Sequence, residues 1–199
     1  GFGSSKQNQF VLFSPQGLQV DLLPFGEIEV EGKVMIEGKG LTQIAVNGFR
    51  EVYENGTDLV SFENKQAFKV CTLPGIVILK LIAYDDRPEV RQNDIKDISL
   101  ILKHYFDIET DIIYEQHNDL FEDNRDTPII AARVVGRQMK RIIGRSIDLE
   151  KRVTAILQRE IDNSEKSKMA ELMVKGTDNS IINAIEILKE ILQGLNDRI

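Results

Sequence analysis

Residues 72–88 read TLPGIVILKLIAYDDRP and mark the place where the chain changes from a β-strand pattern to a helical one. Thr72 is suited to cap the N-terminus of a helix, and Pro74 is well tolerated in a first helical turn. The apolar run IVILKLIAY follows, and Pro88 disfavours helical geometry in the residue before it. These signals predict a helix that begins after Thr72 and ends near Arg87.

Short apolar runs separated by turns fill the chain before Thr72. Residues 9–14 and 18–23 flank Pro15-Gln16-Gly17, an arrangement typical of a β-hairpin. Residues 28–36 alternate acidic and apolar side chains, as a half-exposed strand does. Further short strands are predicted at residues 44–46, 52–53, 59–62 and 68–71, with breaks at Gly38, Gly40, Asn47-Gly48 and Asn55-Gly56.

Helical periodicity dominates after Thr72. A second helix is predicted over residues 93–106, with one apolar stripe formed by Ile95, Ile98, Leu102 and Tyr105. Further helices are predicted at 112–116, from Thr127-Pro128 to 144, from Ser146 to 161, up to Gly176, and from Asp178 or Ser180 onward. The fold class is therefore α+β, with a β-rich part over residues 1–71 and a helical part over residues 72–199.

The composition is that of an ordinary globular protein. The 199 residues are 42% hydrophobic and 29% charged, and the net charge of −7 argues against a general nucleic-acid binder. The single cysteine, Cys71, excludes an internal disulfide and indicates a reducing compartment. No apolar run approaches the ~20 residues that a membrane-spanning helix needs. We therefore expect a cytoplasmic protein without a membrane partner.

Lys80 and Arg87 are the cations of the predicted first helix. They lie seven positions apart, which is two helical turns and nearly the same face. Two aligned cations are suited to a polyphosphate, and arginine can bind one with two parallel hydrogen bonds. The alternative is that Lys80 extends to the surface and Arg87 lies just past the helix end.

Three acids are candidates for catalysis or metal binding. Asp21 lies between Val20 and Leu22 in a short β run, where an acid is costly to bury unless a metal ion or a donor pairs with it. Asp94 and Asp97 lie on or beside the apolar side of the second helix. They are either a cap and a first-turn acid, or acids that orient Lys80 or Arg87 and accept a proton near the substrate.

A basic stripe runs along the third long helix, because Arg133, Arg137, Arg141 and Arg145 recur every four residues, with Lys140 beside them. A solvated face, or pairing with the acidic stretch 107–126, is the plainer interpretation. The alternative is that the stripe has a binding function and contacts phosphate or RNA.

Other chemistries find little support. His104 and His117 have no metal-ligand spacing with Cys71 or with each other. Cys71 precedes a helix start but lacks a histidine at a recognisable spacing, which favours a structural cysteine. The sequence has no Walker loop, dinucleotide fingerprint or nucleophile elbow.

Several motifs follow one another in a recognisable order. They are VDLLPFGEIE, NGFREVYE, LPGIVILKLIAYDDR, NDIKDISLILKHYF and AARVVGRQMKRI. In this order the chain resembles the AbiEii-type nucleotidyltransferase family, whose members include the toxins of type IV toxin–antitoxin pairs. The resemblance covers most of the chain and implies a nucleotidyltransferase palm followed by a helical C-terminal region.

The resemblance also implies roles for single residues. Asp21 would be the third carboxylate that holds Mg²⁺, Lys80 and Arg87 would face the nucleoside triphosphate (NTP), and Asp94 or Asp97 would be the helical acid of the last motif. The implied reaction moves a nucleotidyl group from an NTP to an RNA acceptor, such as tRNA, or to a protein acceptor. A cognate antitoxin is an implied partner.

One family motif is missing. A Gly-Ser turn followed by an Asp-x-Asp pair should precede Asp21, yet Gly3-Ser4 is followed by no acid before Asp21 itself. Residues 2–9 show no helix or strand pattern, and the leading Gly1 suggests that residues upstream were removed. We expect a chain without these carboxylates neither to bind catalytic Mg²⁺ tightly nor to transfer nucleotides. A non-catalytic interaction module on the same fold is the alternative.

Overall fold

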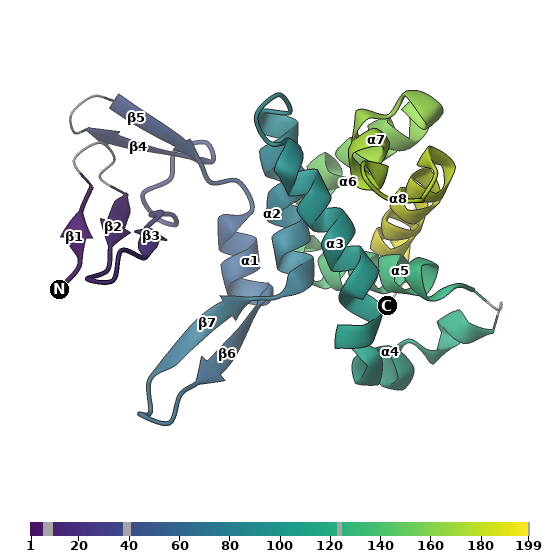
Figure 1. Ribbon diagram of the computed structural model, residues 1–199, viewed down its shortest axis with the longest axis horizontal. Helices are drawn as coiled ribbons and strands as arrows, with labels where there is room; N and C mark the ends of the chain where they lie inside the picture. Colours follow the sequence, from purple (N-terminus) through teal and green to yellow (C-terminus); the bar gives the residue numbers. More distant parts are fainter. Residues whose placement is uncertain (6–9, 38–40, 123–124, 199) are drawn as a thin grey trace. The chain divides into compact units, whose positions relative to one another are not determined.

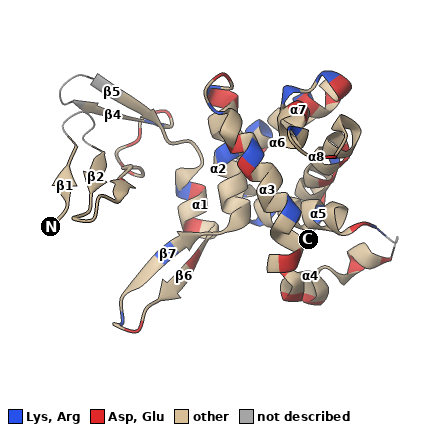
Figure 2. Ribbon diagram, viewed as in Figure 1, with Lys and Arg blue, Asp and Glu red and all other residues tan. Residues whose placement is uncertain are grey.

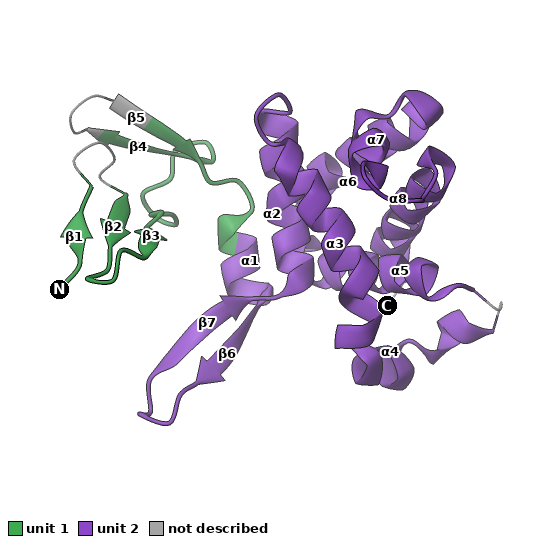
Figure 3. Ribbon diagram, viewed as in Figure 1, with its two compact units in different colours: residues 1–50 green, residues 51–199 purple. Residues whose placement is uncertain are grey.

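The computed structural model describes residues 1–5, 10–37, 41–122 and 125–198 (Figure 1). The chain divides into two compact units, Gly1–Arg50 and Glu51–Ile199 (Figure 3). The first unit is built from short antiparallel strands, and the second from helices with one hairpin. The α+β class predicted from the sequence is confirmed.

Three strands form the first sheet of the N-terminal unit. They are β1 Gly3–Ser4, β2 Val11–Phe13 and β3 Gln19–Asp21, in the order β1-β2-β3 and all antiparallel. The predicted β2–β3 hairpin is confirmed. Its turn is closed by the Gly17 amide, which donates to the Ser14 carbonyl at 2.9 Å, and Gly17 has the positive φ of 84° that this turn needs.

Strand β1 corrects the expectation that residues 2–9 carry no strand. Its residues are exposed, so the sequence shows no alternation of buried and exposed side chains that would predict a strand. The strand exists because its backbone pairs with β2, with Gly3 opposite Phe13 and Ser4 opposite Leu12. The rest of that segment, residues 6–9, lies outside the described residues.

The second sheet of this unit pairs β4 Lys33–Glu37 with β5 Leu41–Ala45. The strand predicted over 28–36 begins only at Lys33, because Glu31 and Gly32 have positive φ angles of 52° and 69° and form a turn. The break predicted at Gly38 and Gly40 lies outside the described residues.

A helix replaces one predicted strand. Residues 52–53 lie in α1, Phe49–Asn55, so the strand prediction at this point is wrong. Gly48, with a φ of 84°, ends the preceding extended segment, and Val52 becomes buried at 3% exposure while its neighbours remain half-buried or exposed. One buried side chain in this short segment fits either a strand or a helix, so the pattern could not separate the two.

The hairpin of β6 Thr57–Ser61 and β7 Ala67–Cys71 belongs to the second unit by its contacts, although the sequence grouped it with the β-rich part up to residue 71. Thr72 connects it to the helices: its amide and hydroxyl both donate to the Gly56 carbonyl, at 2.9 and 3.1 Å. The same hydroxyl accepts from the Gly75 amide at 3.3 Å and so caps α2 as predicted.

The α-helices that follow match the predicted ones closely. The helices are α2 Leu73–Asp86, α3 Gln92–Ile108, α4 Thr110–Gln116, η1 Asn118–Phe121, α5 Thr127–Ile143, α6 Ile147–Asn163, η2 Ser164–Lys166, α7 Lys168–Val174 and α8 Ile181–Asn196. The two short 3-10 helices, η1 and η2, were not predicted. The predicted stripe of α3 is buried at all four positions. These helices surround one apolar core, to which α2, α3, α5, α6, α7 and α8 all contribute.

Helices α5 and α8 approach each other most closely at a pair of glycines. A Cβ atom added to Gly136 of α5 would lie 2.2 Å from the Ile191 carbonyl oxygen, and one added to Gly194 of α8 would lie 2.2 Å from the Arg133 carbonyl oxygen. Only glycine therefore fits at this crossing.

Within the described residues, no helix is both long and apolar enough to cross a membrane.

Candidate functional site

Helices α2 and α3 bring three of the predicted site residues together. Lys80, in the middle of α2, places its Nζ atom 2.8 Å from Asp94 Oδ1 and 2.7 Å from Asp97 Oδ2. The two aspartates lie three positions apart on α3, so their side chains project from the same side of that helix. This contact of both aspartates with Lys80 is the one that the prediction of acids orienting Lys80 requires.

The electrostatics keep Lys80 charged. Its side chain is only 23% exposed, and burial by itself would lower its pKa; the hydrogen bonds and charges of Asp94 and Asp97 outweigh this, so the pKa of Lys80 is raised. A lysine in this state is a fixed cation and not a proton acceptor.

Asp94 has spare capacity for a hydrogen bond. Its side chain is 15% exposed, and its Oδ2 atom is buried without a hydrogen-bond partner in the described part of the chain. The nearest charged group is Arg91 Nη1 at 3.9 Å, too far for a hydrogen bond. A buried carboxylate oxygen is costly to leave unpaired, so this atom lacks a donor that the described residues do not supply.

Arg91 was not singled out in the sequence. It directly precedes α3 and lies three residues before Asp94, a spacing that could have indicated the pair. Arg87 ends α2: its amide donates to the Ala83 carbonyl at 3.3 Å, and its carbonyl accepts from the Val90 and Arg91 amides at 3.2 and 3.1 Å. Arg87 is exposed and lies just past the last helical residue, Asp86.

Asp21 lies in the other unit, at the end of β3. It is exposed, and its Oδ1 atom accepts a hydrogen bond from Gln19 Nε2 at 3.0 Å. Among the residues that the structure describes, no three His, Cys, Asp or Glu side chains are grouped so that they could hold a metal ion. Mg²⁺ needs several oxygen ligands in near-octahedral geometry, so these residues do not fit a tight magnesium site.

The first two arginines of the basic stripe are held by ion pairs inside the protein. Arg133 binds Asp197 through two hydrogen bonds, at 2.9 and 2.8 Å, and also Glu190 at 3.1 Å. Arg137 binds the same Asp197 at 2.5 Å and Asp119 at 2.8 and 2.6 Å. The predicted pairing with the acidic stretch therefore holds for Asp119, whereas the partners on and after α8 were not foreseen.

The other cations of the stripe differ from Arg133 and Arg137 in their partners and exposure. Lys140 is paired with Glu150. Arg141 is exposed in the last turn of α5, and Arg145 is exposed just past the end of this helix. Figure 2 shows Lys and Arg interspersed with Asp and Glu on the helices of this unit. Any phosphate or RNA contact of the stripe would thus rest on Arg141 and Arg145.

Cys71 and His117 are both removed in part or in full from solvent. Cys71 is half-buried, and burial raises the pKa of its thiol, contrary to the lowering that a position before a helix could produce. His117 is 1% exposed, with Nδ1 3.2 Å from Arg137 Nη1. Burial, together with the charges of Arg137 and Arg141, lowers the pKa of His117.

His117 should make the stability depend on pH. Its pKa lies below 6.5 in the folded protein, so the unfolded chain takes up the proton first as the pH falls. The stabilisation by neutral His117 is complete above pH 6.5 and is lost as the pH falls through the folded pKa. Urea unfolding between pH 7.5 and 5 should show this loss. His117→Gln should abolish this loss of stability. The control His104→Gln, at an exposed position, should retain it. If the free energy of unfolding fell equally with pH in both variants, His117 would not be its cause.

Comparisons with protein-family models, with curated proteins and with solved structures gave no match to this chain. The resemblance to the AbiEii-type family therefore rests on the sequence motifs. The structure adds the contact of Lys80 with Asp94 and Asp97, and the roles of these residues and of Asp21 and Arg87 stay predictions.

Proposed function

We propose that the α2–α3 pair is the nucleoside triphosphate-binding part of a nucleotidyltransferase-like protein. The proposed reaction of the complete site moves a nucleotidyl group from an NTP to a hydroxyl of an RNA or of a protein, as in the toxin of a type IV toxin–antitoxin pair. The observation that carries the proposal is the Lys80 ammonium held between Asp94 and Asp97 at 2.8 and 2.7 Å. These are residues that the family motifs single out.

The Lys80 ammonium has a hydrogen-bond donor left for an anionic ligand. An ammonium group has three donors, and the two carboxylates take two of them, which leaves one for a phosphate oxygen. Arg87 and Arg91 lie at the turn between the two helices, where each could add a charge-assisted hydrogen bond. Glu89 also lies in this turn, so the three cations are matched by three acids and the cluster has no excess positive charge. A polyphosphate would therefore be held by the hydrogen-bond donors of the three cations.

Asp94 is the proposed proton acceptor. In the transfer, the acceptor hydroxyl oxygen would form a bond to the α-phosphorus and pyrophosphate would leave. The hydroxyl proton would pass to Asp94 Oδ2, which accepts no hydrogen bond within the described residues. Asp97 would keep Lys80 in place. The described residues do not supply the metal-binding carboxylates that the family resemblance calls for, so no step is assigned to Mg²⁺ here.

Lys80→Ala should weaken NTP binding at least tenfold, because it removes a charge-assisted hydrogen bond of about 1.5–3 kcal/mol. Isothermal titration of the chain with ATP and GTP, with and without Mg²⁺, measures this. Lys103→Ala, an exposed lysine on α3, is the matched control and should bind within about twofold of the parent chain. Unchanged affinity in a folded Lys80→Ala variant would remove the triphosphate role from this residue.

The second candidate function is a non-catalytic binding module on the same fold. It is favoured by the donor set, since the described residues contain no group of three acids suited to a metal. We expect the chain to bind NTP without transferring nucleotides when it is incubated with radiolabelled NTP, Mg²⁺ and tRNA. Clear Mg²⁺-dependent labelling of the RNA or of a protein would contradict this expectation and favour the enzyme.

A further inference from the structure

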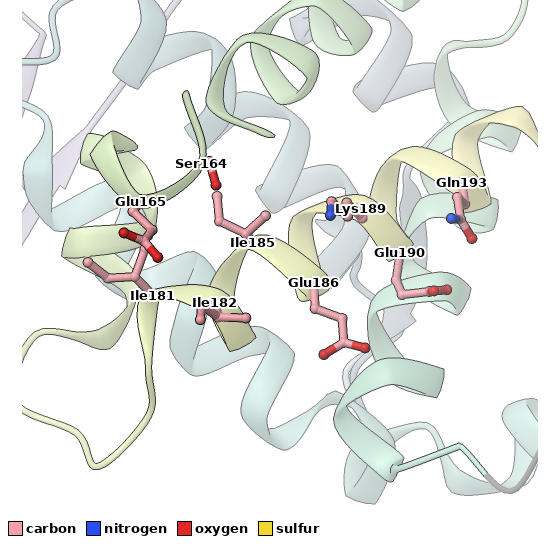
Figure 4. A pocket seen from close by; sticks show the side chains of 9 residues that line it. All are labelled: Ser164, Glu165, Ile181, Ile182, Ile185, Glu186, Lys189, Glu190 and Gln193. Carbon is pink, nitrogen blue, oxygen red and sulfur yellow. The ribbon is translucent and has the colours of Figure 1, made fainter. Parts of the chain in front are cut away.

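A groove of about 540 Å³ lies along α8, and its lining residues are not those of the proposed triphosphate site. Its apolar part is formed by Ile181, Ile182 and Ile185 in the first turns of the helix, and its acidic part by Glu165, Glu186 and Glu190 (Figure 4). Glu165 comes from η2, in the turn after α6, and the other residues come from α8. The groove therefore joins two segments between which α7 lies in the sequence.

The apolar part of the groove is open to solvent. Ile182 is 64% exposed, whereas Ile185 is 6% exposed and closes the floor. Ile182, Glu186 and Lys189 recur at a spacing of four and three residues, so they form one exposed row beside this floor. Exposed Ile182 and the floor at Ile185 together offer an apolar surface that an aliphatic side chain can contact.

The free charges around the groove are mostly negative. Glu190 is neutralised by Arg133 and Arg125, at 3.1 and 3.3 Å. The side chains of Glu165 and Glu186, by contrast, have neither an ion pair nor a hydrogen bond within the described residues. Among the described residues that line the groove, Lys189 is the one cation. The chain as a whole carries a net charge of −7, which draws cationic partners toward it.

We infer that this groove binds an amphipathic helix of a partner protein that carries lysine or arginine beside an aliphatic residue. The aliphatic side chain enters the groove over Ile185 and contacts Ile182. The cationic side chains reach Glu165 and Glu186, which have no ion pair among the residues that the structure describes. Helices that bind in grooves are recognised in this way, by apolar anchors with complementary charges beside them.

The test uses two synthetic peptides of about 15 residues, long enough to form a helix. Both have the same leucine face, and the polar face carries lysine in one and glutamate in the other. The lysine peptide should bind and shift the methyl NMR signals of Ile182 and Ile185, and the glutamate peptide should not. Glu186→Lys and Glu165→Lys should each weaken the lysine peptide about threefold to tenfold, and Lys189→Glu should strengthen it by a similar factor.

Two controls separate the groove from the net charge. Glu63→Lys changes the net charge by the same amount as Glu186→Lys but lies in the exposed turn of the β6–β7 hairpin. It should change the affinity for the lysine peptide by less than about twofold. Ile182→Ser keeps the charge and should weaken binding at least about threefold, because it removes an apolar anchor. Equal binding of both peptides, equal effects of Glu63→Lys and Glu186→Lys, or unchanged affinity of Ile182→Ser would each overturn the inference.

Discussion

Replacing Gly136 by alanine is expected to lower the free energy of unfolding of the helical unit by about 3 kcal/mol. The added Cβ atom would lie 2.2 Å from the Ile191 carbonyl oxygen and 2.9 Å from Gly194 Cα, both of which are backbone atoms. Backbone atoms of a packed helix cannot move aside singly, so α5 and α8 would have to separate. Urea unfolding followed by circular dichroism at 222 nm measures the loss.

The sign of the change in stability caused by Gly136→Ala separates close helix packing from helix propensity. Helix propensity alone predicts that Gly→Ala in a helix interior stabilises by about 1 kcal/mol. Gly3→Ala, where an added Cβ meets nothing within 4 Å, is the control and should change the stability little. Gly194→Ala should behave as Gly136→Ala does, since its Cβ would lie 2.2 Å from the Arg133 carbonyl oxygen. A stabilised Gly136→Ala variant would show that the helices do not approach as described.

Replacing Asp197 by alanine is expected to cost about 2 kcal/mol, because it leaves two mostly buried arginines without their shared carboxylate. Arg133 and Arg137 are 15% and 12% exposed, and both bind Asp197. Each keeps one other acid, Glu190 or Asp119, which limits the loss. Arg145→Ala, at the exposed end of the same stripe, should stay within about 0.5 kcal/mol. Equal costs for both variants would contradict a structural role for Asp197.

The same network should be sensitive to acid. Despite burial, the two arginines lower the pKa of Asp197, and hydrogen bonding to Arg137 lowers the pKa of Asp119. Carboxyl groups with lowered pKa values stabilise fully above their ordinary value of 3.8, and the stabilisation is lost as the pH falls below it. Asp197→Asn should therefore reduce the loss of stability between pH 4 and 2.

The proposed site was partly accessible from the sequence. Lys80, Asp94 and Asp97 were singled out, and the structure places them in contact. Arg91 was missed because its only signal is a short spacing to Asp94, a pattern shared by many surface pairs. Asp21 was singled out by its strand and by the family motif, yet the structure shows it exposed and bound to Gln19. Whether it holds a metal ion depends on ligands that a single strand does not provide.

The sequence by itself determined the α-helices after Thr72 and most of the turns. Caps such as Thr72, breakers such as Pro88, and periodic apolar stripes act over a few residues, and a local interaction can be read locally. It did not determine β1, whose exposed residues are a strand only because β2 pairs with them, nor α1, where one buried valine fitted either structure.

Tertiary structure alone decided which distant groups meet. Asp197 binds Arg133 and Arg137, and Gly136 lies against Gly194, across separations of about 60 residues. Nothing in the local pattern marks these partners, because ion pairs and close helix contacts depend on how the helices cross. For the same reason, the acids and isoleucines of α8 became a groove only when the turn after α6 placed Glu165 beside them.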